Sequence, residues 1–302
     1  MVNMKNSNLP SKQTILIAGA TGSIGGGAAV ALAKRGNRVV LLGRNSNKLK
    51  AKAELIRASL NKNKISFQEE DIDILEINFS DMESVRHAAE ESLSRFPEIN
   101  CLILCVGAYI QKGPNLLPSG HEVMFATNVL GPFLFTQLLI DRMQRSDGLV
   151  LHVIAPFSKE IDWNDIECIQ NHRTMTAFNR TKTCNRVIAG ELARRYEGKI
   201  SSVAFDPTYV IDKSDPDLGK RWPSGPRGFF WHVMTILFAR PPAIAGEPIA
   251  DLIISHQDRR LINGAVFKLN KRIRKPNKAM NDENLGKRLW KELVRKTGLG
   301  TG

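Results

Sequence analysis

Residues 14–27 read TILIAGATGSIGGG, an apolar run that leads directly into a cluster of glycines. The apolar run predicts a β-strand, and the small residues after the glycines predict a helix. Glycines permit the tight turn and the close approach of backbone to a ligand, while the helix N-terminus favours negative charge. The turn is therefore expected to hold a diphosphate, although its spacing is G-x-x-G-x-x-G rather than G-x-G-x-x-G. The residues expected there are Gly19, Thr21, Gly22, Ser23, Ile24 and Gly25.

Beyond this turn, short apolar runs alternate with helical patterns along the whole chain, which is typical of βαβ units. The predicted strands are 14–18, 38–42, 71–77, 100–106, 149–155, 200–205 and 265–269. The predicted helices are 24–35, 47–60, 81–96, 120–143, 174–196, 247–255 and 281–296. We therefore expect an α/β fold, a Rossmann-type doubly wound and mainly parallel sheet of seven strands with helices on both faces.

The composition, 42% hydrophobic and 24% charged over 302 residues, indicates one soluble globular domain and excludes disordered and fibrous proteins. No secretory signal is visible, so a cytoplasmic protein is expected. The four cysteines lack C-x-x-C spacing, and no metal site is expected. Residues 1–12 are expected to be flexible. Residues 212–240 are expected to form a lid or substrate-side insertion. Within it, the apolar run 229–238 is too short to span a bilayer. This run could dip into a membrane, cover a substrate, or pack on the core or on a partner subunit.

The formal net charge of +13 is concentrated at the C-terminus, where residues 257–302 hold 13 Lys and Arg against 4 Asp and Glu. Residues 270–302 are thus expected to form a basic segment with a helix. Such a segment could contact an anionic membrane surface or an acidic carrier, although most charge runs are solvated surfaces. No nucleic-acid motif accompanies it, so nucleic acid is not an expected partner. The sequence leaves open whether the chain forms a homo-oligomer.

The end of the second predicted strand favours one nicotinamide cofactor over the other. An NAD site places Asp or Glu there for the ribose hydroxyls, whereas an NADP site needs cations for the 2′-phosphate. Between Lys34 and Ala53 the sequence has no acid. Arg44, with Lys48 or Arg35 nearby, can pair with a phosphate, so NADP(H) is the expected cofactor.

Several segments in order resemble the short-chain dehydrogenase/reductase family, and specifically its retinol-dehydrogenase-like branch, over nearly the whole chain. These segments are the glycine turn, Arg44-Asn45, 125–131 (FATNVLG), 191–195 (ELARR) and 287–293 (KRLWKEL). The resemblance implies an oxidoreductase of a small organic substrate, apolar or carrier-bound. It also implies further cofactor contacts from Asn45, Asn78, Phe79, Gly107, Lys182, Pro207 and Val210.

The same resemblance implies an active site of Asn, Ser, Tyr and Lys. Asn128 and Lys182 match the Asn and the Lys, but Ala155 stands in the Ser position and Phe178 in the Tyr position. Other departures lie around the same pocket: residues 104–107 (LCVG) replace N-N-A-G, Pro207-Thr208 replaces P-G, and Asn78 replaces an Asp. Since neither Ala nor Phe can donate a proton, ordinary ketone reduction or alcohol oxidation is not expected.

Few residues could replace the missing acid. Tyr109 and Tyr209 follow strands at their carboxyl ends, where ligands bind in such sheets, and each could be a displaced donor or an aromatic wall. Tyr196 is expected to face solvent. His152 should point to the sheet face opposite Ala155, and Ser158 is a further candidate.

Three functions therefore remain open from the sequence. The first is an NADPH-dependent reductase with an unusual acid, or one that reduces an electron-poor C=C or C=N bond. The second is a non-redox cyclase or isomerase on the same scaffold, and the third is a catalytically silent cofactor-binding protein.

Overall fold

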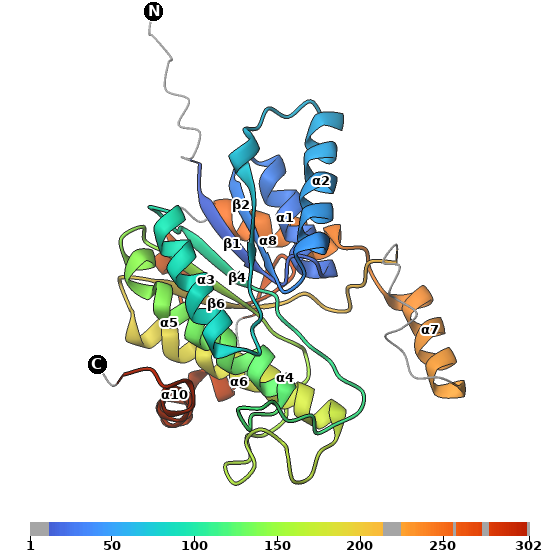
Figure 1. Ribbon diagram of the computed structural model, residues 1–302, viewed down its shortest axis with the longest axis vertical. Coiled ribbons are helices and arrows are strands. Elements are labelled where there is room, and N and C mark those ends of the chain that lie inside the picture. The colour runs from blue at the N-terminus through green and yellow to red at the C-terminus, as the bar shows by residue number, and fades with distance from the viewer. Residues whose placement is uncertain (1–11, 214–224, 256–257, 274–277, 301–302) are drawn as a thin grey trace, which may run out of the picture.

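The computed structural model describes residues 12–213, 225–255, 258–273 and 278–300 (Figure 1). Residues 1–11 of the predicted N-terminal segment and residues 214–224 of the predicted lid lie outside this range. One sheet organises the molecule, with strand order β3-β2-β1-β4-β5-β6-β7-β8. Its strands are β1 (Thr14–Ala18), β2 (Arg38–Gly43), β3 (Ile72–Glu76), β4 (Cys101–Leu104), β5 (Leu149–Val153), β6 (Ser201–Asp206), β7 (Val266–Lys268) and β8 (Lys271–Arg272).

The first seven strands are parallel and correspond to the seven that the sequence predicts. The eighth strand was not predicted. It pairs antiparallel with β7 and consists of two exposed basic residues, so it carries no apolar signal that could reveal it. The helices are α1 (Ser23–Lys34), α2 (Ser46–Lys62), α3 (Met82–Arg95), α4 (Val123–Phe125), α5 (Gly131–Gln144), α6 (Thr174–Arg195), α7 (Pro226–Phe238), α8 (Ala243–Ser255), α9 (Lys278–Asn281) and α10 (Glu283–Thr297).

Helices cover both faces of the sheet, which confirms the doubly wound α/β fold (Figure 1). Successive residues of a strand alternate between two apolar cores: Leu16 and Val40 pack with α3, α5, α6 and α10, whereas Ile15 and Val39 pack with α1, α2 and α8. Because both faces are buried, the strands read as continuous apolar runs rather than as alternating ones.

The predicted helix 120–143 begins at Val123 and is interrupted by a π-helical turn, η2 (Ala126–Leu130). Within the described residues this stretch, Val123–Gln144, is the one that is long and apolar enough to cross a membrane by length and composition. However, 78% of its apolar window is buried inside the protein. It is therefore a core helix beside the sheet.

The C-terminal helix α10 packs across α5 and α6. Trp290 meets the ring of Phe133 edge-on, with 4.9 Å between ring centroids, and the guanidinium of Arg195 lies 4.6 Å from the centre of the Trp290 ring. The basic C-terminal segment therefore contains a helix, as predicted, and one side of it belongs to the core.

Candidate functional site

The glycine turn forms an open cradle at the start of α1. Gly22 caps the helix without any side-chain hydrogen bond, and no acid lies in the first turn of α1. Gly19 has φ +79°, and a Cβ at Gly25 would lie 2.5 Å from the Gly19 carbonyl oxygen. Only glycine fits at these two positions. The cradle therefore suits a diphosphate bound by backbone N–H groups.

The chain that follows β6 closes over this cradle. The backbone N–H of Asp212 donates to Ser23 Oγ at 2.7 Å, and Val210 forms a bridge with Arg240 at the base of α7. Pro207 and Val210 are both buried. The predicted cofactor residues of the first and sixth strands thus meet at one edge of the sheet, the carboxyl edge.

Arg44 lies exposed just past the end of β2, and no described residue forms an ion pair or hydrogen bond with its guanidinium. Asn45 caps α2, since its Oδ1 accepts from the backbone N–H of Lys48 at 2.9 Å. The expectation that Arg35 lies near Arg44 is wrong. Arg35 follows the far end of α1 and pairs with Glu247 and Asp251 on α8.

Lys182 is buried beneath the carboxyl ends of β4 and β5. Its Nζ donates to the carbonyl oxygens of Val106 at 2.9 Å and Val153 at 3.4 Å. Burial lowers the pKa of Lys182 to about 8. Gly107 leaves room beside it, because a Cβ there would lie 3.4 Å from Nζ. An ammonium held by two neutral oxygens keeps one N–H for a further acceptor, such as a ribose hydroxyl.

Asn128 is fully buried in the π-helical turn η2. Its Oδ1 accepts from the N–H of Ala108 at 2.7 Å, and its Nδ2 donates to the carbonyl of Ala108 at 2.9 Å and to Thr181 Oγ1 at 3.2 Å. Asn128 therefore ties the segment after β4 to α6 beside Lys182. Sequence reasoning did not find the π turn, although such turns are frequent at functional sites.

Phe178 lies between Lys182 and Tyr109. Lys182 Nζ is 5.6 Å from the centre of the Phe178 ring, and the ring of Tyr109 packs edge-on against it at 5.4 Å between centroids. Ala155 lies just beyond β5, and its carbonyl accepts from Arg186 Nη2 at 2.7 Å. The site thus combines a buried ammonium, an apolar ring and a partly exposed phenol.

Comparison with known proteins agrees with this architecture. The sequence model of the short chain dehydrogenase family matches residues 13–160. Mouse retinol dehydrogenase 13 is 26% identical over 97% of this chain and 86% of its own length. The chain belongs to the short-chain dehydrogenase/reductase superfamily. Within this superfamily the chain is similar to the retinol-dehydrogenase-like branch, and the relatives that match it are oxidoreductases.

Solved structures support the fold of this family member. A protein of Mycobacterium paratuberculosis superposes with a TM-score of 0.69 at 20% identity, covering 95% of this chain and 93% of that one. A short chain dehydrogenase from Shigella flexneri, solved in complex with NADP, gives a TM-score of 0.64 at 19% identity and covers 88% and 100%. At such identities the likeness shows the fold alone.

The two tyrosines proposed for this reductase-family site differ in their surroundings. Tyr109 contacts Phe178, whereas the Tyr209 hydroxyl lies 2.9 Å from Thr235 Oγ1 on α7. Tyr196 is not solvent-facing as predicted. It is half-buried against the core, and its hydroxyl donates to Gln137 Oε1 at 3.2 Å.

His152 lies in β5, and its side chain points to the same face of the sheet as that of Val150, which packs on the α6 side. The side chain of Val153 packs on the opposite face. His152 therefore points away from the face that Ala155 continues, as predicted. Burial lowers the pKa of His152 to about 3, so the ring is neutral at pH 7. Burial likewise raises the pKa of the Cys105 thiol, in the position of the family's asparagine, to about 12. Ser158 lies exposed in the loop after β5.

Three polar residues near this edge were missed in the sequence. Thr181 binds Asn128, and Arg186 donates to the Ala155 carbonyl while its Nη1 has no partner in the described part of the chain. Thr208 adopts φ +65°, where the family has glycine, and its buried Oγ1 has no partner among the described residues. The Pro-Thr pair was the one available signal for Thr208. Arg186, one turn after Lys182, resembles any helix-surface arginine.

Asn78 and Phe79, the remaining predicted contacts, follow the carboxyl end of β3. Asn78 uses its Oδ1 to accept from Ser80, and Phe79 is buried against Phe135. A Cβ at Gly131 would lie 2.0 Å from the carbonyl oxygen of Phe79, so glycine lets α5 approach this segment.

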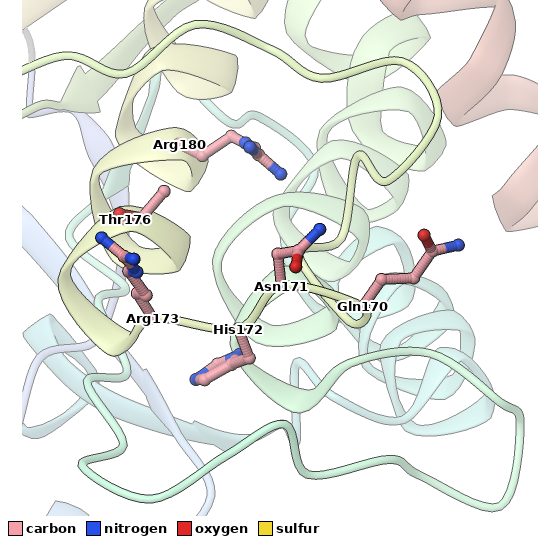
Figure 2. Close-up of a pocket in the computed structure, with 6 residues that line it drawn as sticks. All are labelled: Gln170, Asn171, His172, Arg173, Thr176 and Arg180. Carbon is pink, nitrogen blue, oxygen red and sulfur yellow. The ribbon is translucent and has the colours of Figure 1, made fainter.

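An open pocket of about 520 Å³ lies at the N-terminal end of α6 (Figure 2). It is lined by Gln170, Asn171, His172, Arg173, Thr176 and Arg180. An α-helix turns by roughly 100° per residue, which puts Thr176 and Arg180 on the side of α6 opposite Phe178 and Lys182. This pocket is therefore separate from the site built around Lys182.

Proposed function

We propose that this protein is an NADP(H)-dependent reductase that delivers hydride to an electron-poor C=C or C=N bond, or to an unusual carbonyl. The observation that carries the proposal is the contrast within one site: Lys182 and the glycine cradle fit the cofactor, while Ala155 and Phe178 offer no proton. A bound NADPH would supply the hydride.

The cofactor fit rests on this chain's own groups. The open amides of α1 suit a diphosphate, Lys182 suits the nicotinamide ribose, and the exposed Arg44 suits a 2′-phosphate. Ser23, whose Oγ accepts from the backbone N–H of Asp212, would lie beside the diphosphate.

The substrate class follows from the missing hydroxyls. In ketone reduction the developing alkoxide needs a donor, whose loss typically costs about 10²–10⁴-fold in rate. When hydride lands on the far carbon of an activated C=C bond, the proton goes to carbon instead, and it can come from water or from the phenol of Tyr109. The Tyr109 ring already contacts Phe178, so this phenol is the preferred donor.

The test is NADPH consumption with an activated enone, a cyclic imine and a simple ketone, with mass-spectrometric detection of deuterium transferred from C4-deuterated NADPH. Oxidation of NADPH with label in the product of the enone or imine supports the proposal. Turnover without NADPH would favour a cyclase or isomerase, and cofactor binding without turnover a silent protein.

Tyr109→Phe tests the donor, because it removes the hydroxyl and keeps the ring against Phe178. We expect turnover to fall by about 10²-fold or more with unchanged NADPH affinity. Tyr209→Phe is the matched control and should retain turnover, because it removes only the hydroxyl that faces Thr235. Full activity of Tyr109→Phe would assign the proton to water.

A further inference from the structure

Helix α7 presents a row of large apolar side chains to solvent, namely Phe229, Phe230, Ile236, Leu237 and Phe238, each more than half exposed. Figure 1 shows α7 projecting from the body of the protein. Single exposed apolar residues are ordinary, but a contiguous group on one element marks a surface that something covers.

The opposite side of α7 is anchored to the protein. Thr235 is 1% exposed, and its Oγ1 lies 2.9 Å from the hydroxyl of Tyr209. At roughly 100° per residue, Phe229, Phe230, Ile236 and Leu237 fall in one arc centred opposite Thr235. The helix is thus amphipathic relative to the protein: one side holds the segment after β6, and the other is apolar and faces outward.

Positive charge borders this apolar side. Arg240, exposed directly after α7, and Lys213, whose Nζ donates to the Ile236 carbonyl at 2.7 Å, lie at its C-terminal end. A second copy of this chain would bring another formal charge of +13, which opposes self-association through a basic surface.

We propose that α7 docks the protein on an anionic lipid surface, with its outward apolar side chains in the interfacial zone and Arg240 and Lys213 at the headgroups. Apolar burial together with attraction of cations to anionic lipid is how helices bind in the membrane plane. The 13 residues of α7 reach only about 20 Å, less than the roughly 30 Å of a bilayer core, so α7 lies on the surface.

Docking would also orient the site. The backbone N–H of Arg240 donates to the carbonyl of Tyr209, and that of Ile211 donates to the carbonyl of Arg240, so the base of α7 is fixed to the segment after β6. The carboxyl edge of the sheet would then face the bilayer, and a lipid-dissolved substrate could reach it directly. The docking itself does not depend on the reaction proposed above.

Vesicle flotation of the full chain tests the docking. Vesicles of phosphatidylcholine with about one-third phosphatidylserine should carry the protein at least ten-fold better than vesicles of phosphatidylcholine alone, and added salt should weaken the binding. Phe230→Ser with Leu237→Ser should lower the binding at least ten-fold, and Arg240→Gln about five-fold. The matched control is Leu55→Ser with Leu261→Ser. Leu55 and Leu261 are 63% and 67% exposed, close to the 56% and 66% of Phe230 and Leu237 on α7.

Three outcomes would overturn the proposal. The first is wild-type protein that stays unbound by anionic vesicles, and the second is an equal loss in the control variant. The third is a wild-type dimer in solution that the α7 double variant converts to monomer without any vesicle binding, because α7 would then cover a second copy. Circular dichroism of each variant checks that folding is retained.

Discussion

Arg44 is the side chain on which discrimination between the two nicotinamide cofactors depends. Its guanidinium can make a charge-assisted contact with a 2′-phosphate, and no described side chain competes for it. Arg44→Ala should therefore weaken NADPH binding by about 1.5–3 kcal/mol and leave NADH binding nearly unchanged, as measured by calorimetric titration. Arg145→Ala, at an exposed arginine after α5, is the control. Equal losses for both cofactors would contradict an NADP site.

His152 gives a pH dependence to stability. The folded-state pKa of His152, about 3, lies below the ordinary histidine value of 6.5, so the unfolded chain binds a proton between these values and the folded protein does not. Stability is full above pH 6.5 and falls as the pH drops toward 3. His152→Leu removes this contribution. Between pH 7 and pH 5, the free energy of unfolding of the variant should therefore fall by about 2 kcal/mol less than that of the wild-type protein.

Chemical denaturation at the two pH values measures the effect. His87→Leu is the control for the loss of a histidine, because the His87 side chain is 80% exposed. A pH dependence identical in wild type and His152→Leu would mean that the ring takes up a proton in the folded state.

Individual residues also show which features of the site could not be predicted from the sequence alone. Tyr109 and Tyr209 both follow strands, and topology alone put them in the same class. The edge-on contact of Tyr109 with Phe178 and the bond of Tyr209 to Thr235 depend on loops whose paths no periodicity encodes. Tyr196 forms a hydrogen bond with Gln137, 59 residues earlier, and a contact between residues so far apart in sequence could not be predicted either.

Helices α1 and α8 approach through two glycines. A Cβ on Gly246 would lie 2.4 Å from the backbone of Gly27, and a Cβ on Gly27 would lie 2.5 Å from the carbonyl of Pro242. Gly246→Ala should therefore destabilise the protein by about 1–3 kcal/mol, although alanine is the better helix former. Denaturant unfolding measures it. Gly300→Ala, where an added methyl meets no atom within 4 Å, is the control, and stabilisation of Gly246→Ala would refute this tight contact.

At the level of elements, the sequence predicted what periodicity and turn signals encode. All seven parallel strands and the long helices occur where expected, because buried runs and amphipathic stripes are local patterns. The strand β8 and the π turn at Asn128 were missed. The first has only two charged residues, and the second has no sequence period that distinguishes it from the α-helix around it.

For the whole molecule, the site divides into two halves that differ in whether their side chains fit the expected roles. The half that would hold NADP(H) comes from β1, β2, β4 and α6, and its groups are in place. The half that would protonate a substrate oxygen comes from the β5 end and from α6 one turn before Lys182, and there Ala155 and Phe178 supply no proton. The fold and family of the scaffold were predictable from sequence, whereas the substrate is not encoded in any motif.

Restoration of the two missing hydroxyls tests this account most directly. NADPH oxidation with simple ketones and aldehydes would be measured for wild type, Ala155→Ser, Phe178→Tyr and the double variant. The Phe178 ring lies 5.6 Å from Lys182 Nζ, so a tyrosine there would place a phenol within the influence of the ammonium. We predict carbonyl reduction in the double variant at least about 10²-fold above wild type. Wild-type protein that reduces simple ketones as fast as the double variant would contradict the loss of the proton donor.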